Sequence, residues 1–170
     1  MTAYVALLRA VNVGGRKLLM SDLKTIAEEA GLDNAKTFIA SGNLLFGSTK
    51  DETAVARLLE ERLKAHMKAE VPVLVRTAAE LATVVENNPF PGSPGSKVAA
   101  IFLVKAPPKD ALEKASGMAD EELALGAREI YVHYPSGMGR SKLRLPAAAG
   151  GTARNMNTVA KLAAMAKEVE

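Results

Sequence analysis

Cysteine is absent from this chain of 170 residues, and so is tryptophan. Without cysteine the protein can have no disulfides, no thiolate nucleophile and no cysteine-ligated metal, and it fits a reducing compartment. The aromatic residues are four Phe and three Tyr, and no Arg-Gly-Phe-x-Phe string of the kind that stacks RNA bases is present. The two histidines, His66 and His133, lie on separate predicted elements and indicate neither a metal site nor a catalytic triad.

Long hydrophobic runs are also missing. No run approaches the roughly 20 apolar residues that span a bilayer, and the short apolar run after Tyr4 lacks the basic leader of a signal peptide. The composition, with 48% hydrophobic and 24% charged residues, is typical of a folded domain with a real core. We therefore expect a soluble, cytoplasmic protein that does not interact with membranes.

Acidic residues are missing from two windows, 1–21 and 130–167. The windows carry a charge of +9, whereas the rest of the chain has 13 cations against 19 acids, a net charge of −6. The cations in the windows are Arg9, Arg16, Lys17, Arg140, Lys142, Arg144, Arg154, Lys161 and Lys167. This segregation predicts one electropositive site that both ends of the chain build, with Arg9, Lys142 and Arg154 converging on it, and hence an anionic partner.

The spacing of apolar residues in the first half predicts the order βαββαβ. The predicted strands are residues 4–11, 36–41, 44–47 and 71–75, and the predicted helices are residues 21–31 and 51–67. Ser21 and Asp51 are the expected N-caps, Gly31 the expected helix end, and Gly42-Asn43 the expected two-residue hairpin turn. This order is that of the ferredoxin-like unit.

The second half predicts a similar order that lacks the last strand. A capping box, Thr77-x-x-Glu80, opens a connecting helix, and a Pro/Gly-rich loop follows it. Strands are predicted over residues 98–104, 123–125 and 130–134, and helices over residues 107–116 and from Thr152 onward. We therefore expect an α+β protein with two ferredoxin-like subdomains, 1–76 and 97–170, the second incomplete, joined by residues 77–96.

Polar strings in the acid-free windows supply most of the candidate ligand-binding residues. They are Arg9, Asn12, Gly14, Gly15, Lys17, Ser41, Asn43, Ser141, Lys142, Arg154, Asn155, Asn157, Thr158 and Lys161. Glycines after a strand let backbone N–H groups approach an anion, and a helix from Thr152 would place Arg154, Thr158 and Lys161 on one face. No Asp/Glu pair lies in these strings, so the sequence offers no candidate for carboxylate acid/base catalysis and no visible general base.

Each string also has a plain structural interpretation. Residues 9–17 read equally well as an ordinary turn with solvated cations, since they lack the third glycine and downstream acid of a dinucleotide fingerprint. Residues 41–43 fit simple turn chemistry. Residues 136–142 fit a flexible basic loop, because Leu143-Arg-Leu-Pro146 follows where a Walker A loop leads directly into a helix. Residues 152–161 fit a solvated helix start.

Five ordered motifs resemble one bacterial family, domain of unknown function 1697. They are Arg9-Ala-Val-Asn-Val-Gly-Gly15, Thr37-Phe-Ile-Ala-Ser-Gly-Asn43, Asn88-Pro-Phe90, Ser141-Lys-Leu143 and Thr152-Ala-Arg-Asn-Met-Asn-Thr-Val159. Ala10 stands where the family pattern has glycine, and Met156 where it has tryptophan. The resemblance implies a two-subdomain α+β fold related to the ferredoxin-like plait, and it brings no activity, substrate or catalytic residue.

The leading functional hypothesis is a protein that binds a small anionic ligand, a nucleotide or a phosphorylated metabolite. The runner-up is an RNA- or DNA-binding module whose cations neutralise phosphates along a strip. The third is a protein-interaction module in which the polar strings are structural. The sequence identifies no metal site and no cofactor, leaves open whether the protein is an enzyme, and does not determine the oligomeric state.

Overall fold

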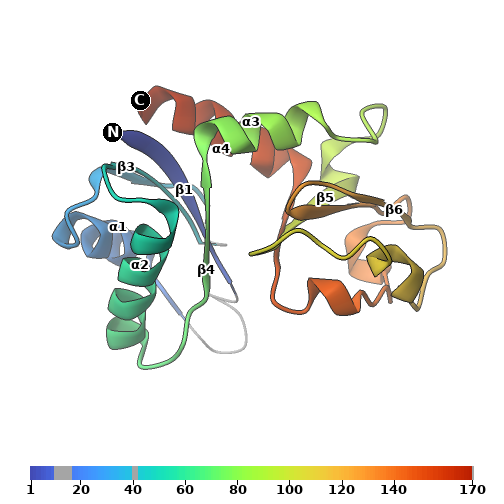
Figure 1. Cartoon of the computed structure of the whole chain (residues 1–170), viewed down its shortest axis with the longest axis horizontal. Coiled ribbons are helices and arrows are strands. Elements are labelled where there is room, and N and C mark those ends of the chain that lie inside the picture. Colours follow the sequence, from blue (N-terminus) through green and yellow to red (C-terminus); the bar gives the residue numbers. More distant parts are fainter. Residues whose placement is uncertain (10–16, 40–41, 170) are drawn as a thin grey trace. The chain divides into compact units, whose positions relative to one another are not determined.

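The structure, a computed structural model, describes residues 1–9, 17–39 and 42–169. The chain forms two compact units, Met1–Leu81 with Leu162–Glu170, and Ala82–Lys161. The unit boundaries fall within α3 (Ala78–Glu86) and α4 (Met156–Val169) (Figure 1). In the described part of the chain, no helix combines the length and the hydrophobicity needed to cross a membrane.

The first unit confirms the predicted βαββαβ order. Its elements are β1 (Thr2–Leu8), α1 (Met20–Glu29), β2 (Asp33–Thr37), β3 (Asn43–Ser48), α2 (Glu52–Met67) and β4 (Val73–Thr77). The strands form one antiparallel sheet in the order β2-β3-β1-β4. Figure 1 shows α1 and α2 on the same side of this sheet. The architecture is α+β, as the sequence predicts.

The core of the first unit lies between that sheet face and the two helices. Alternate residues of β1 point to it, and the helices contribute residues three or four positions apart. Its members include Tyr4, Ala6, Leu8, Leu23, Ile26, Phe46, Val55, Leu59 and Leu63, all buried. Each large apolar side chain buried in this way contributes about 1.5–3 kcal/mol, so the hydrophobic periodicity decides which face of each element turns inward.

Helix ends in the first unit follow the local signals in two of three cases. The Asp51 carboxylate accepts from Ala54 N at 2.8 Å and caps α2, as predicted. Gly31 follows the end of α1 with φ +82°, also as predicted. The predicted N-cap Ser21 is wrong, because α1 already begins at Met20 and Leu19 occupies the cap without a side-chain hydrogen bond.

The connection between β2 and β3 is longer than the predicted two-residue turn. β2 ends at Thr37, and Asn43 is the first residue of β3 rather than a turn residue. The side chain of Asn43 is fully buried, and its Nδ2 donates to the carbonyl of Phe38 at 2.9 Å. The side-chain amide of Asn43 thus links the start of β3 to the residue that follows β2. Asn43 is therefore a buried strand residue with a structural hydrogen bond, and not an exposed turn residue.

The second unit repeats the strand order of the first. Its strands are β5 (Val98–Phe102), β6 (Glu122–Leu125), β7 (Glu129–His133) and β8 (Thr152–Asn155). They form an antiparallel sheet in the order β6-β7-β5-β8, so position by position the two sheets are equivalent. The predicted similarity of the two halves is therefore confirmed at the level of strand order.

The second unit has short turns where the first has helices. A helix over 107–116 is wrong: only a 3₁₀ turn, η2 (Ala111–Lys114), forms there. The segment between Pro108 and Gly117 is short. Forming the first turn of a helix is unfavourable, and a short segment adds too few further hydrogen bonds to offset that cost. Further 3₁₀ turns, η3 (Met138–Arg140) and η4 (Pro146–Ala148), lie between β7 and β8. Leu103, Ile130 and Val132 form a buried hydrophobic cluster in this unit, and Leu112 of η2 and Ala147 of η4 pack against it.

The predicted start of the last helix at Thr152 is also wrong. Residues 152–155 form β8, the fourth strand, which pairs with β5 from Phe102↔Thr152 to Ala99↔Asn155. Thr and Asn have low helix propensity, so residues 152–155 have only a weak preference for a helix. The backbone hydrogen bonds that they form with the edge of β5 are more favourable, and the segment becomes a strand. The second sheet is therefore complete, and Arg154 lies on a strand rather than on the helix face of Thr158 and Lys161.

A buried arginine stands one residue before the end of the fourth strand in both sheets. Arg76 donates from Nη1 to the carbonyl of Val75 at 3.1 Å, and Arg154 donates to the carbonyl of Ala153 at 2.9 Å. The residue after each arginine caps the next helix. Thr77 Oγ1 accepts from Glu80 N at 3.1 Å, which confirms the predicted capping box, and Asn155 Oδ1 accepts from Thr158 N at 2.8 Å. The two halves thus share local chemistry as well as topology.

Candidate functional site

Two segments of the second unit form a pocket of about 480 Å³. One segment leads into β6 and the other follows β7. Because the two strands are antiparallel neighbours, the chain before β6 lies beside the chain after β7. The pocket is lined by Gly117, Ala119, Asp120, Glu121, Ser136, Gly137, Arg140, Ser141 and Lys142. Its volume lies within the usual range of small-molecule sites.

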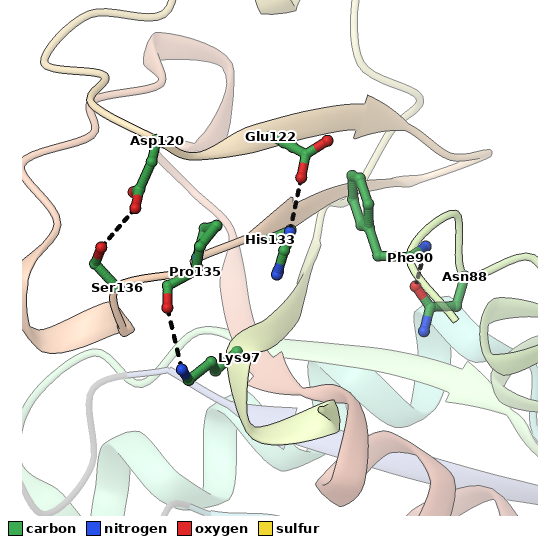
Figure 2. Close-up of polar contacts among 8 residues, drawn as sticks. All are labelled: Asn88, Phe90, Lys97, Asp120, Glu122, His133, Pro135 and Ser136. Atoms are coloured by element: carbon green, nitrogen blue, oxygen red, sulfur yellow. Dashed lines mark hydrogen bonds and ion pairs between the residues drawn. The ribbon is translucent and has the colours of Figure 1, made fainter. Parts of the chain in front are cut away.

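Carboxylates engage both serines of this pocket. Ser136 Oγ donates to Asp120 Oδ2 at 2.5 Å (Figure 2), and Ser141 Oγ donates to Glu121 Oε2 at 2.5 Å. Two carboxylates therefore lie beside the basic string, although no Asp or Glu is found within it. The acids come from 16 and 20 positions upstream, outside the acid-free window.

The Glu121 carboxylate is held in its charged form. Its pKa is lowered, first because Ser141 donates to it, and next because Ala119 N donates to its Oε1 at 2.6 Å. Hydrogen bonds to a carboxylate stabilise the anion over the neutral acid. The resulting contribution to stability is present above the ordinary pKa of 4.5 and is lost as the pH falls through the lowered pKa.

Ser141→Ala should raise the pKa of Glu121 toward its ordinary value, because the variant removes the largest cause of the lowering. We expect a carboxyl-carbon NMR titration of Glu121 to move to higher pH in this variant. Ser96→Ala, an exposed serine of the same unit, is the matched control and should leave the titration unchanged. An unchanged Glu121 titration in Ser141→Ala would contradict this account of the pocket.

The two cations of the pocket, Arg140 and Lys142, are exposed. Arg140 and Lys142 line the same cavity as Asp120 and Glu121. Across residues 1–9, 17–39 and 42–169, however, neither cation pairs with an acid. Both carboxylates bind serines instead, so the positive charge is not neutralised by hydrogen-bonded contact within the pocket.

A backbone clamp fixes the rim of the pocket. Ser116 and Arg144 exchange two backbone hydrogen bonds, of 3.0 and 2.8 Å. Gly117 has φ +70°, and a Cβ there would lie 2.1 Å from the carbonyl oxygen of Lys142. The close approach holds the segment with the two cations against the segment with the two acids.

A second polar group lies farther along the same hairpin. His133 Nδ1 is 2.9 Å from Glu122 Oε1 across the β6–β7 ladder (Figure 2). The ring of Phe90 is 5.5 Å from the His133 ring, and Asn88 Oδ1 accepts from Phe90 N at 2.9 Å. The Asn88-Pro-Phe90 string thus forms a turn that places an aromatic ring against a histidine. Glu122 is the first residue of β6, and Glu121 of the pocket immediately precedes the strand.

The predicted site residues are divided among three groups. Asn12, Gly14, Gly15 and Ser41 lie outside the described residues. Arg9, Lys17 and Asn43 belong to the first unit, where Arg9 and Lys17 are exposed and Asn43 is buried. The others, Ser141, Lys142, Arg154, Asn155, Asn157, Thr158 and Lys161, belong to the second unit. Of these, Ser141 and Lys142 line the pocket.

The remaining predicted residues surround the start of α4. Arg154 is 9% exposed, and burial lowers its pKa to about 10, because the charged form loses hydration. Asn155 caps the helix, whereas Asn157 and Lys161 are exposed. A Cβ on Gly95 would collide with Asn157 Oδ1, so the glycine admits that side chain at close range. None of these residues is part of the pocket lining.

Sequence reasoning missed Gly117, Asp120, Glu121 and Arg140 as residues of the site. The signal for the acids was available, because the predicted hairpin of 123–125 and 130–134 places residue 120 beside residue 136. In the described part of the chain, no three His, Asp or Glu side chains gather in a way that could hold a metal ion.

One family model matches more than half of the chain. The family model described as "Protein of unknown function (DUF1697)" matches residues 1–131. Among solved structures, the chain is similar to the conserved bacterial protein SP0830 from Streptococcus pneumoniae. The TM-score is 0.81 and the identity 25%, over 98% of this chain and 99% of that one. No curated protein matches.

Proposed function

This chain belongs to the DUF1697 family, and from its own pocket we propose that it binds a small anionic ligand, a nucleotide or a phosphorylated metabolite. The observation that carries the proposal is the pair of exposed cations, Arg140 and Lys142, in one cavity of about 480 Å³. Arginine and lysine bind phosphate groups through charge-assisted hydrogen bonds, and a cavity of this size holds a metabolite.

The local charge balance supports this proposal. The two acids of the pocket are engaged by Ser136 and Ser141, which turns the carboxylates toward hydroxyl donors and away from ion pairs with the cations. Holding two cations near each other without an acid contact has an electrostatic cost, and a bound anion would relieve it. A bound phosphate would give Arg140 and Lys142 the direct anionic contact that they lack among the described residues.

Inorganic phosphate should raise the melting temperature of the wild type. At ten times Kd, binding stabilises by about 1.4 kcal/mol, which corresponds to about 4 °C for a protein of this size. The double variant Arg140→Ala, Lys142→Ala should lose most of that shift, because it removes both phosphate-binding charges. Differential scanning calorimetry at constant ionic strength measures the effect.

The matched control is the double variant Lys105→Ala, Lys109→Ala. It removes the same charge from exposed positions of the same unit, outside the pocket. Phosphate also stabilises proteins by exclusion from their surfaces, and this general effect should persist in all three proteins. Equal shifts in the pocket variant and the control variant would refute the anion site.

A further inference from the structure

The pocket holds charges of both signs without joining them. Asp120, Glu121, Arg140 and Lys142 all line it, and within the described residues none of the four takes part in an ion pair. A surface that needed only to bind phosphate would gain from having no acids nearby, since like charges repel an anion. Phosphate binding alone therefore does not explain why Asp120 and Glu121 line the pocket.

Their oxygens are not equally engaged. Glu121 uses both, one with Ser141 and the other with Ala119 N. Asp120 uses Oδ2 with Ser136, whereas no described residue donates to its Oδ1. Ser136 thus orients the Asp120 carboxylate, and Oδ1 of this lining residue keeps its acceptor capacity among the described residues.

We propose that the anionic ligand also carries a sugar or polyol hydroxyl, and that Asp120 Oδ1 accepts a hydrogen bond from it while Arg140 and Lys142 hold the phosphate. The inference rests on the proposed function and specifies its ligand class. An acidic side chain that accepts from ribose hydroxyls is a common means of recognising nucleotides. A hydroxyl is the better donor than a ligand ammonium, because it adds no further positive charge to a cavity that already holds Arg140 and Lys142.

Two phosphate monoesters of equal charge and carbon number test the proposal. Glycerol 3-phosphate carries two hydroxyls, and n-propyl phosphate carries none. Titrations of each are followed through the backbone amides of residues 136–142 in two-dimensional NMR spectra at constant ionic strength. The wild type should bind glycerol 3-phosphate about tenfold more tightly than propyl phosphate, as a hydrogen bond to a charged acceptor provides.

Asp120→Ala should abolish that preference and bind propyl phosphate more tightly than the wild type does, because a repulsive charge has been removed. Ser136→Ala keeps the carboxylate but frees its orientation, and it should reduce the preference. Asp110→Ala removes the same charge from an exposed carboxylate outside the pocket and should leave the preference intact. The dispersion of the same spectra shows whether each variant is folded.

The outcomes separate the two proposals. If both esters bind the wild type equally, and Asp120→Ala strengthens both by the same factor, the hydroxyl contact is refuted and the anion site stands. If neither ester shifts these amides, both proposals fail. If the preference survives in Asp120→Ala, a group other than Asp120 recognises the hydroxyl, and the assignment is wrong.

Discussion

Gly117→Ala is expected to destabilise the protein by about 3 kcal/mol and to abolish phosphate binding in the pocket. An alanine at φ +70° costs about 1–2 kcal/mol, because its Cβ crowds the next carbonyl. The new Cβ would also lie 2.1 Å from the oxygen of Lys142 and 2.9 Å from its carbonyl carbon. Both atoms belong to the backbone, so they can move away only if the neighbouring segment shifts.

That shift would strain the clamp between Ser116 and Arg144, whose two backbone hydrogen bonds adjoin the collision. Gly31→Ala is the matched control. Gly31 has φ +82°, but no atom lies within 4 Å of the position that a Cβ would take. Gly31→Ala therefore has the energetic cost of the left-handed backbone conformation but no steric collision. Urea denaturation compares the two variants, and equal losses of stability would show that the approach of Gly117 to Lys142 does not constrain the rim.

Arg154→Ala is expected to lower the free energy of unfolding by about 2–4 kcal/mol, against at most about 0.5 kcal/mol for Arg57→Ala. Arg154 is 9% exposed, and its guanidinium donates to Ala153 O at 2.9 Å. Truncation leaves both a cavity and a carbonyl that has lost this donor. Arg57 is exposed on α2, so its loss affects little besides surface charge.

A third variant separates packing from charge. Burial removes water from around the charged Arg154 side chain and lowers its pKa to about 10. Arg154→Met keeps most of the volume without the charge, and we expect a loss smaller than that of Arg154→Ala, since neutral replacements of buried ions are often tolerated. Thermal unfolding provides the comparison, and equal melting temperatures for Arg154→Ala and Arg57→Ala would mean that Arg154 has no structural role.

The sequence predicted the first unit well because its signals are local. The cap at Asp51, the glycine after α1 and the capping box from Thr77 to Glu80 all involve neighbours within four residues. It failed at β8 and at residues 107–116, where chain pairing and a short connection override weak helix preference. Strand pairing links residues about 50 positions apart, and no local pattern records it.

For the candidate site, the sequence identified the basic string and not its surroundings. Ser141 and Lys142 were found from composition, whereas Asp120 and Glu121 lie in an acid-rich stretch whose composition does not distinguish them from the neighbouring acids. The residues that complete the pocket are contributed by the opposite arm of a hairpin. Extending that predicted hairpin by a few residues at its open end would have brought Asp120 to Ser136.

By itself, the sequence determined the α+β class, the βαββαβ order of the first unit and the family, because hydrophobic period, caps and motifs are properties of neighbouring residues. Only the tertiary structure decided that the second sheet has a fourth strand, that both serines of the basic loop bind carboxylates, and that Arg140 and Lys142 remain without acid partners among the described residues. The physical reason is that side-chain partners are chosen by distance in space. Antiparallel pairing brings together segments whose charges the sequence keeps apart.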